Sequence, residues 1–148
     1  MADRLAPTAA VLLVEDDAAD ALLIQDALHD NGLAHTITHV TDGVAALEHL
    51  QDPSSARPDL IVLDWNMPRM GGRELLEVLK ADPASQTIPV VVLTTSGAPN
   101  DVADSYQRHA NAHVTKPLNL DDFIAVVTRI DDFFLGTSVT APHPNSTT

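Results

Sequence analysis

The sequence contains no cysteine, which excludes a disulfide framework and a metal site built from thiolates. Basic residues are scarce: 8 lysines and arginines stand against 21 aspartates and glutamates, for a formal net charge of −13. So negative a surface repels phosphate backbones, which argues against direct binding to DNA or RNA. Apolar runs long enough to cross a membrane, about 20 residues, are missing, and the first ten residues lack the apolar stretch of a signal peptide. We therefore expect a cytosolic protein that does not insert into membranes.

What the sequence does contain is a regular alternation of apolar runs and helical patterns. Five successive strand–helix units predict an α/β fold, in which helices cover both faces of a five-stranded parallel sheet. The strand order 2-1-3-4-5 is taken from flavodoxin-like, doubly wound proteins. Hydrophobic residues make up 45% of the 148 residues, and we expect one domain over residues 9–135 and a disordered tail over residues 136–148. The expected strands are 11–14, 35–40, 60–63, 90–93 and 113–115, and the expected helices are 18–31, 43–50, 72–80, 99–108 and 120–135.

Several residues are placed where helices begin or end. Asp17, Asp42 and Asn119 precede helical patterns, and their side chains can cap the N-termini of those helices. For Asp17 we favour this capping role over metal binding. Pro99 suits the first turn of the fourth helix, and Gly32 suits the end of the first.

Acidic residues follow two of the expected strands at the point where each strand ends. Glu15 and Asp16 follow the first strand, and Asp64 follows the third. The carboxyl ends of parallel strands meet at the same end of a sheet, and strands 1 and 3 are neighbours in the expected order, so these three carboxylates converge. Carboxylates that lie close together repel one another, and a hard divalent cation relieves the repulsion. An all-oxygen ligand set of this kind suits Mg²⁺.

The two remaining strand ends supply groups that bind phosphate. Thr94 ends the fourth strand and Lys116 follows the fifth; a hydroxyl and an ammonium can each bind a phosphoryl oxygen. A carboxylate such as Asp64 can form an acyl phosphate. Taken singly, each residue has an ordinary explanation as a loop, surface or strand-forming residue. Together, the four strand ends predict phosphoryl transfer to Asp64.

These residues closely resemble the receiver domain of two-component response regulators, over about residues 9–135. Thr94 lies 30 residues and Lys116 lies 52 residues after Asp64, and both intervals fit the family. The motifs that carry the resemblance are Leu13-Val14-Glu15-Asp16-Asp17, Leu63-Asp64-Trp65-Asn66-Met67-Pro68-Arg69-Met70-Gly71-Gly72, Thr94-Thr95-Ser96 and Thr115-Lys116-Pro117.

The resemblance implies a role for each of the acidic residues. Asp64 would be the phosphoacceptor, and Asp16 would be a direct Mg²⁺ ligand. Glu15 would act on the metal mainly through water, and Asn66 would contribute its backbone carbonyl.

The resemblance also implies the phosphoryl-binding groups and the donor. Thr94 and Lys116 would bind the phosphoryl oxygens, and the Lys116–Pro117 peptide bond would be cis. The donor would be the phosphohistidine of a histidine kinase. The receiver itself would catalyse phosphoryl transfer and its own dephosphorylation, so we do not expect a separate turnover enzyme.

More narrowly, the sequence resembles stand-alone regulators that are paired with bacterial phytochromes. This implies a bacteriophytochrome as the partner kinase. The segments that carry this resemblance are residues 19–24, 94–96, 110–112 and 130–135.

Three residues depart from the family pattern. His113 stands where the family usually has its aromatic switch residue. Two explanations stay open: His113 is only an exposed polar residue, or the coupling from Thr94 to the outer face differs from the family and depends on pH. His109 replaces a glycine at the end of helix 4, which predicts a left-handed backbone there. Leu118 replaces a phenylalanine, a change that we interpret as one of packing alone.

The last expected helix has more apolar residues than one buried stripe requires. Two explanations stay open for the surplus: the phenylalanines fold back on their own sheet, or the patch joins two chains into a homodimer through helix 4, strand 5 and helix 5. The buried stripe is expected to be Leu120, Phe123, Ile124, Val127 and Ile130, and the surplus patch is Val126, Phe133, Phe134 and Leu135.

Two other functions fit these features less well. An FMN-binding electron carrier would need a loop rich in hydroxyl groups and glycine after the first strand, where Glu15, Asp16 and Asp17 would repel the phosphate. A phosphatase of the haloacid dehalogenase class needs a second acid two residues after its nucleophile, where this chain has Asn66. Both are disfavoured.

Overall fold

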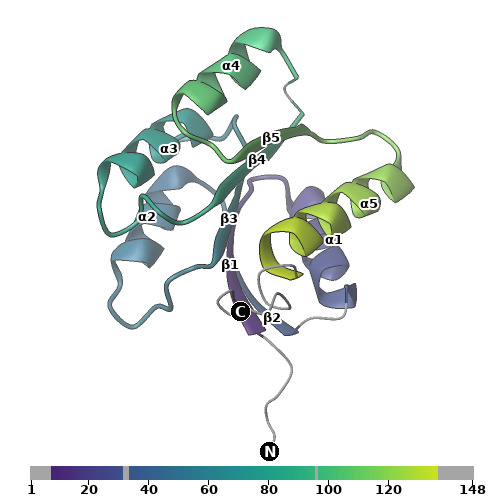
Figure 1. The fold of residues 1–148 in the computed structure, drawn as a ribbon, viewed down its shortest axis with the longest axis horizontal. Coiled ribbons are helices and arrows are strands. Elements are labelled where there is room, and N and C mark those ends of the chain that lie inside the picture. The colour runs from purple at the N-terminus through teal and green to yellow at the C-terminus, as the bar shows by residue number, and fades with distance from the viewer. Residues whose placement is uncertain (1–7, 32–33, 96, 137–148) are drawn as a thin grey trace, which may run out of the picture.

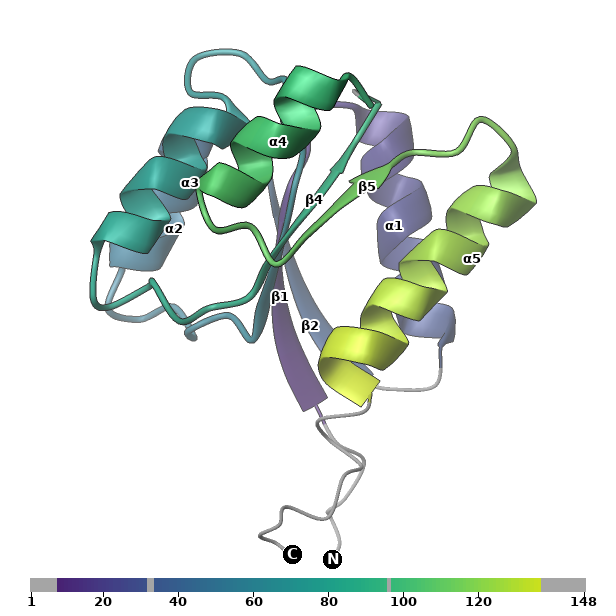
Figure 2. The ribbon, with the colours of Figure 1, turned by 45° about the horizontal axis from the view of Figure 1, so that its top comes forward.

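The computed structural model describes residues 8–31, 34–95 and 97–136. Its five strands form one parallel sheet in the order β2-β1-β3-β4-β5, which confirms the predicted doubly wound, flavodoxin-like fold. Helices α1 and α5 cover one face of the sheet, and α2, α3 and α4 cover the other (Figures 1 and 2). The strands are β1 (Thr8–Val14), β2 (Ala34–Val40), β3 (Leu60–Leu63), β4 (Val90–Thr94) and β5 (Ala112–Thr115), and the helices are α1 (Ala18–Asp30), α2 (Gly43–Gln51), α3 (Gly72–Ala81), α4 (Pro99–Gln107) and α5 (Leu120–Asp131).

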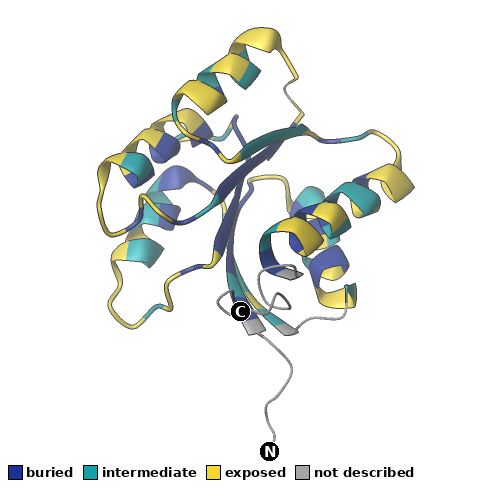
Figure 3. Cartoon of the chain, viewed as in Figure 1, coloured by how far each residue is buried: buried dark blue, intermediate teal, exposed yellow. Residues whose placement is uncertain are grey.

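Two separate cores lie on the two faces of the sheet. Side chains alternate along a strand, so in β1 Leu13 packs with α1 and α5, whereas Leu12 packs with α2 and α3. All residues of β3 and β4 are buried, as expected for strands that are covered on both faces. Figure 3 shows this buried sheet between helices whose outer sides are exposed. No helix of the described residues is long and apolar enough to span a bilayer.

The predicted helix caps are confirmed where the structure describes them. The side chains of Asp17, Asp42 and Asn119 accept hydrogen bonds from main-chain N–H groups in the first turns of α1, α2 and α5. Pro99 occupies the first turn of α4. Gly32 lies outside the described residues.

The expected left-handed residue at the end of α4 is also confirmed. His109 has a φ of 70°, a region that L-residues other than Asn, Asp and His seldom enter. Its N–H donates to the Tyr106 carbonyl, 3.0 Å away, which closes the last turn of the helix.

The expected single helix over residues 120–135 divides in two. After α5 the chain forms a π-helical turn, η2 (Asp132–Gly136). Leu135 is 2% exposed, and Phe134 packs beside it against the core on the α1 and α5 face. Val126 is also partly buried there. The turn thus folds back on its own sheet, and Phe133, which is 72% exposed, is the one large apolar side chain of the predicted patch that faces solvent.

Three predictions of burial were wrong. Leu120 is 53% exposed and Ile124 is 38% exposed, so the buried stripe of α5 is narrower than the apolar sequence suggests. The helix has apolar residues on more sides than its contact with α1 and the sheet can cover. Leu118 is fully exposed and does not take the packing role that we assigned to it.

Candidate active site at the carboxyl ends of the strands

Main-chain hydrogen bonds carry the strand pairing one residue beyond the strands and fix the residues that follow them. The N–H of Asp64 donates to the carbonyl of Val14 at 3.0 Å, and the N–H of Lys116 donates to the carbonyl of Thr94 at 2.7 Å. The backbones of the predicted site residues are therefore held by the sheet itself and share one end of it.

The three predicted carboxylates come together there. Glu15, Asp16 and Asp64 each offer an oxygen, and these oxygens all lie within 4.8 Å of one another. Glu15 and Asp64 are buried, whereas Asp16 is exposed, so the cluster is open on one side. A group of oxygen ligands with one open side fits Mg²⁺, which keeps part of its water shell when a protein binds it.

The predicted lysine also reaches this cluster. The Nζ of Lys116 lies 2.6 Å from Glu15 Oε1, 2.9 Å from Asp20 Oδ2 and 3.6 Å from Asp64 Oδ2. Burial opposes the charged form of Lys116, but its hydrogen bonds to Glu15 and Asp20 and the nearby Asp64 outweigh that effect and raise its pKa. The side chain is therefore a permanent cation beside the expected phosphoacceptor.

The surroundings of Glu15 disfavour the ionised form of its carboxyl group. Burial raises the pKa of Glu15 to about 7; its hydrogen bond with Lys116 opposes this, and the nearby Asp64 adds to it. The carboxylate also accepts a hydrogen bond from the main-chain N–H of Asp17 at 3.1 Å. A carboxyl group that is hard to ionise in the metal-free protein is the feature that a bound divalent cation would relieve.

Two predicted residues reach this end of the sheet in different environments. Thr94 ends β4 and is completely buried. Asn66 is exposed, and its N–H donates to Asp64 Oδ1 at 3.4 Å. The roles of Thr94 in phosphoryl binding and of the Asn66 carbonyl in metal binding stay predictions.

The loop between β3 and α3 is held tightly around Asp64. Gly72 opens α3 so close to the main-chain oxygen of Asp64 that a Cβ at this position would collide with it. The loop is tied to α2 as well, because Arg69 Nε donates to Asp42 Oδ2 at 2.7 Å. Arg69 itself has a φ of 61°. These contacts fix the position of the expected phosphoacceptor.

His113, at the expected switch position, lies in β5 against α4. Its Nδ1 is 2.9 Å from Ser105 Oγ, and its ring meets that of Trp65 edge to face at 6.5 Å. The Ser105 hydroxyl has one hydrogen, which it donates to the Val102 carbonyl at 2.8 Å. Nδ1 of His113 is therefore the donor in the contact with Ser105. Since Trp65 directly follows Asp64, His113 connects the site to α4.

The Lys116–Pro117 peptide bond is trans, so the cis bond implied by the family resemblance was a wrong prediction. The trans form is the lower in energy for most X–Pro bonds, by about 0.5–1 kcal/mol. The main-chain bond from Lys116 to Thr94 is made with this trans geometry.

Asp20 is a site residue to which the sequence reasoning gave no role. In the sequence it is only part of a segment that resembles phytochrome-paired regulators, yet in the structure its carboxylate is one of two that hold Lys116. The signal was present: Asp20 lies three residues after the capping Asp17, in the first turn of a helix that begins at the carboxyl end of β1.

The family model of the response regulator receiver domain matches residues 11–128. Response regulator Rcp1 from Synechocystis is 43% identical over 146 residues, which cover 96% of this chain and 99% of the relative.

Two solved structures are also similar along most of their length. The phosphorylated cyanobacterial phytochrome response regulator RcpA matches with a TM-score of 0.85 and 41% identity, over 88% of this chain and 96% of that one. The Mn²⁺-bound form of Rcp1 matches with a TM-score of 0.83 and 43% identity, over 87% of this chain and 96% of that one. The predicted likeness to phytochrome response regulators is confirmed.

Proposed function

Because the chain belongs to the family of response regulator receiver domains, we propose that it is a phosphorylation switch that accepts a phosphoryl group on Asp64 in a Mg²⁺-dependent reaction. One observation carries the proposal. The carboxylates of Glu15, Asp16 and Asp64 cluster within 4.8 Å, and the ammonium of Lys116 lies 3.6 Å from Asp64.

Each residue has a distinct part in the transfer. A carboxylate oxygen of Asp64 attacks the phosphorus of the donor, the bond from phosphorus to the donor atom breaks, and the donor atom keeps the bonding electrons. Lys116 and Thr94 bind the phosphoryl oxygens, and Lys116 offsets the charge that they bring. Asp16, Asp64, the Asn66 carbonyl and, through water, Glu15 would hold Mg²⁺. The metal would screen the phosphoryl group from the carboxylate that attacks it.

The donor that we propose is the phosphohistidine of a sensor histidine kinase, and more narrowly of a bacteriophytochrome. Support comes from the likeness to RcpA, a cyanobacterial phytochrome response regulator, at 41% identity. The protein would catalyse its own phosphorylation and dephosphorylation and would pass the signal on through contacts with other proteins.

The proposal is tested with a small-molecule donor, so that no kinase is required. After incubation with acetyl phosphate and Mg²⁺, the intact mass of the protein should rise by about 80 Da, one phosphoryl group on one carboxylate. Omission of Mg²⁺ or the substitution Asp64→Asn should abolish the adduct. Asp26→Asn, which changes an exposed aspartate of α1, is the matched control and should leave the adduct unchanged. An adduct of undiminished size in Asp64→Asn would overturn the proposal.

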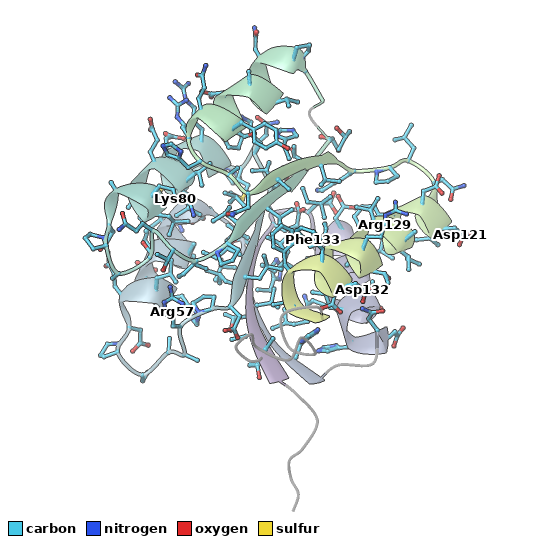
Figure 4. The ribbon with its side chains drawn as sticks, in the orientation of Figure 1. Arg57, Lys80, Asp121, Arg129, Asp132 and Phe133 are labelled. Carbon is cyan, nitrogen blue, oxygen red and sulfur yellow. The ribbon has the colours of Figure 1, made fainter. Side chains whose placement is uncertain are left out.

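We also propose a homodimer through the face formed by α4, β5 and α5, with Phe133 as its apolar contact. Phe133 is 72% exposed and stacks edge to face on Phe134 at 4.9 Å, which holds its ring in place. Figure 4 places Phe133 and Asp132 at the far end of α5 from Asp121. Leu135 is buried and Phe134 is partly buried, so neither adds much to such a contact.

Sedimentation of Phe133→Glu tests the dimer, because a charge at the centre of an apolar contact opposes association. We expect the variant to be monomeric at concentrations at which the wild type is dimeric. Val78→Glu, at another exposed apolar residue, on α3, is the control and should assemble as the wild type does. A Phe133→Glu protein that assembles as the wild type does would contradict the proposal.

A further inference from the structure

The lysine of the site is held by two carboxylates, and neither of them is the expected phosphoacceptor. Lys116 Nζ is in hydrogen-bonding distance of Glu15 Oε1 (2.6 Å) and Asp20 Oδ2 (2.9 Å), whereas Asp64 Oδ2 at 3.6 Å is beyond it. The side chain of Lys116 is 4% exposed, so little water replaces a bond that is lost. These contacts hold the Lys116 ammonium beyond hydrogen-bonding distance of Asp64, the expected phosphoacceptor.

Asp20 is fixed in this position by the helix that carries it. It lies in the first turn of α1, and its N–H donates to the capping carboxylate of Asp17 at 2.9 Å. Its carboxylate accepts a hydrogen bond from Lys116 Nζ at 2.9 Å. Asp20 and Lys116 also line a cavity of about 290 Å³ together with Thr95 and Leu118, outside the carboxylate cluster. Asp20 thus binds the ammonium on the cavity side, away from the cluster.

We propose that Asp20 is a positioning residue that holds Lys116 in a resting position and competes with the phosphoryl group for its ammonium. The inference rests on the proposed phosphorylation of Asp64. In the resting protein, Lys116 bonds to Asp20. When a phosphoryl group occupies Asp64, the ammonium exchanges the Asp20 carboxylate for a phosphoryl oxygen. Asp20 therefore weakens the binding of phosphoryl groups and adds to the free-energy difference between the two states.

The competition predicts the effect of removing the charge of Asp20. In Asp20→Asn, the side chain keeps its shape but offers Lys116 a neutral oxygen, and hydrogen bonds to charged groups are about twice as strong as neutral ones. Lys116 is then more easily drawn to the phosphoryl group. Because the N–H that bonds to Asp17 is unchanged, the cap of α1 is retained.

The experiment uses beryllofluoride with Mg²⁺ as a phosphoryl mimic, and reads binding from the fluorescence of Trp65, the one tryptophan of the chain, directly after Asp64. We expect Asp20→Asn to bind about tenfold more tightly than the wild type, which corresponds to about 1.4 kcal/mol. Asp20→Glu keeps the charge and should stay within about threefold of the wild type, about 0.7 kcal/mol on the same scale. Asp26→Asn removes an exposed charge from the same helix and should bind as the wild type does. Equal affinities of Asp20→Asn and the wild type would overturn the inference.

A double-mutant cycle separates an effect through Lys116 from a general effect of charge. With Lys116→Gln as the background, Asp20→Asn should no longer tighten binding. A tenfold gain that persists there would show that Asp20 acts without Lys116, and the inference would be wrong. A second measurement needs the wild type alone: the NMR signals of the Lys116 ammonium and the Asp20 carboxyl carbon should both shift when beryllofluoride binds. An unchanged Asp20 signal would contradict the exchange of partners.

The inference and the proposed function fail in different ways. If acetyl phosphate leaves no adduct on wild-type protein, the proposed function fails. If the adduct forms on Asp64 and Asp20→Asn binds beryllofluoride as the wild type does, only the role of Asp20 fails.

Discussion

At the scale of single residues, the site is a balance among buried charges of opposite sign. Glu15 and Asp64 are buried beside each other, and Lys116 is the cation between them. Burial raises the pKa of Glu15 to about 7, while Lys116 is held in its charged form. A divalent cation bound at this cluster would therefore favour the ionised form of Glu15.

The raised pKa of Glu15 predicts how metal binding depends on pH. The carboxyl group has a higher pKa in the folded protein, about 7, than its ordinary value of 4.5. Its contribution to stability is therefore complete below pH 4.5 and is lost as pH rises through about 7. A divalent cation favours the ionised form, so the affinity for Mg²⁺ should rise as pH rises to 7, and binding below pH 7 should release a proton.

Isothermal titration of Mg²⁺ into the protein in buffers of different ionisation enthalpy measures that proton release. Glu15→Gln is the control, since it cannot release a proton and should flatten the pH dependence near pH 7. If the affinity of the wild type for Mg²⁺ does not change as pH rises to 7, the raised pKa of Glu15 is contradicted.

The sequence predicted which strand-end residues meet at this end of the sheet, but it predicted neither Asp20 nor its pairing with Lys116. Glu15, Asp64 and Lys116 each follow a buried strand, and parallel strands bring such residues to one end of a sheet. The pairing of Lys116 with Asp20 spans 96 residues of sequence and depends on where the first turn of α1 lies. No periodic pattern encodes that placement.

At the scale of elements, α4 is attached to the sheet mainly by polar contacts. Ser105 is its one buried residue, and it bonds to His113 of β5. Two ion pairs join α4 and its C-cap to α3: Arg73 contacts Asp104 at 3.3 Å, and Arg108 contacts Glu77 at 3.0 Å. Arg108 also pairs with Asp104 of α4. Because so few residues of α4 are buried, we expect this helix to be held less firmly than its neighbours.

The bond between Ser105 and His113 should restrain α4. In Ser105→Ala, the Nδ1 of His113 loses its acceptor, and loss of one such bond costs about 0.5–1.5 kcal/mol. Amide hydrogens of α4 should therefore exchange with solvent roughly 2- to 12-fold faster, by the same free energy, while those of α1 stay unchanged. Hydrogen exchange followed by mass spectrometry measures both, and equal protection of α4 in the variant and the wild type would contradict this view.

The influence of His113 on the response to pH stays a prediction. Histidine is the residue type whose ordinary pKa lies closest to physiological pH, and the ring of His113 lies between Trp65 and Ser105. The response of α4 to phosphorylation should therefore depend on pH in the wild type and not in His113→Tyr. Hydrogen exchange of the phosphorylated proteins at pH 6 and pH 8 makes the comparison. If the response of the wild type is as independent of pH as that of His113→Tyr, this prediction is wrong.

Element boundaries show where sequence reasoning reached its limit. The start of β1 at Thr8 follows from its pairing with β2 along the whole strand, which its own residues do not reveal. The break between α5 and η2 arises because Phe134 and Leu135 pack against the core, whereas the helical pattern continues through them. In both places tertiary contacts outweigh local preference.

At the scale of the whole molecule, the two ends of the sheet differ. The carboxyl ends of the strands hold the expected phosphoacceptor, and the opposite end holds a buried cluster of polar side chains. At the opposite end from Asp64, His35 Nε2 lies 2.9 Å from Asp131 Oδ1, and both side chains are fully buried. Asn31 Nδ2 donates to the other oxygen of Asp131 at 2.7 Å. This cluster ties β2, α5 and the end of α1 together, far from the expected phosphoacceptor.

Removal of His35 should destabilise the fold and spare the chemistry. His35→Ala leaves the buried Asp131 with one hydrogen-bond partner in place of two, and loss of a hydrogen bond to a carboxylate costs roughly 1.5–3 kcal/mol. Urea unfolding measures the change in the free energy of unfolding. His29→Ala, at an exposed histidine of α1, is the matched control. A loss in His35→Ala no larger than in the control would show that the cluster contributes little.

The central claim is that the phosphoryl group resides on Asp64 and on no other carboxylate of the cluster. The most direct test is to locate it. Borohydride reduces an acyl phosphate to an alcohol, so protein treated with acetyl phosphate and Mg²⁺ and then reduced should contain homoserine in place of the modified aspartate. Peptide sequencing by mass spectrometry should find homoserine at position 64 alone, with Asp16 and Glu15 intact. Homoserine at position 16, or no reduced residue in the peptide that contains Asp64, would contradict the account.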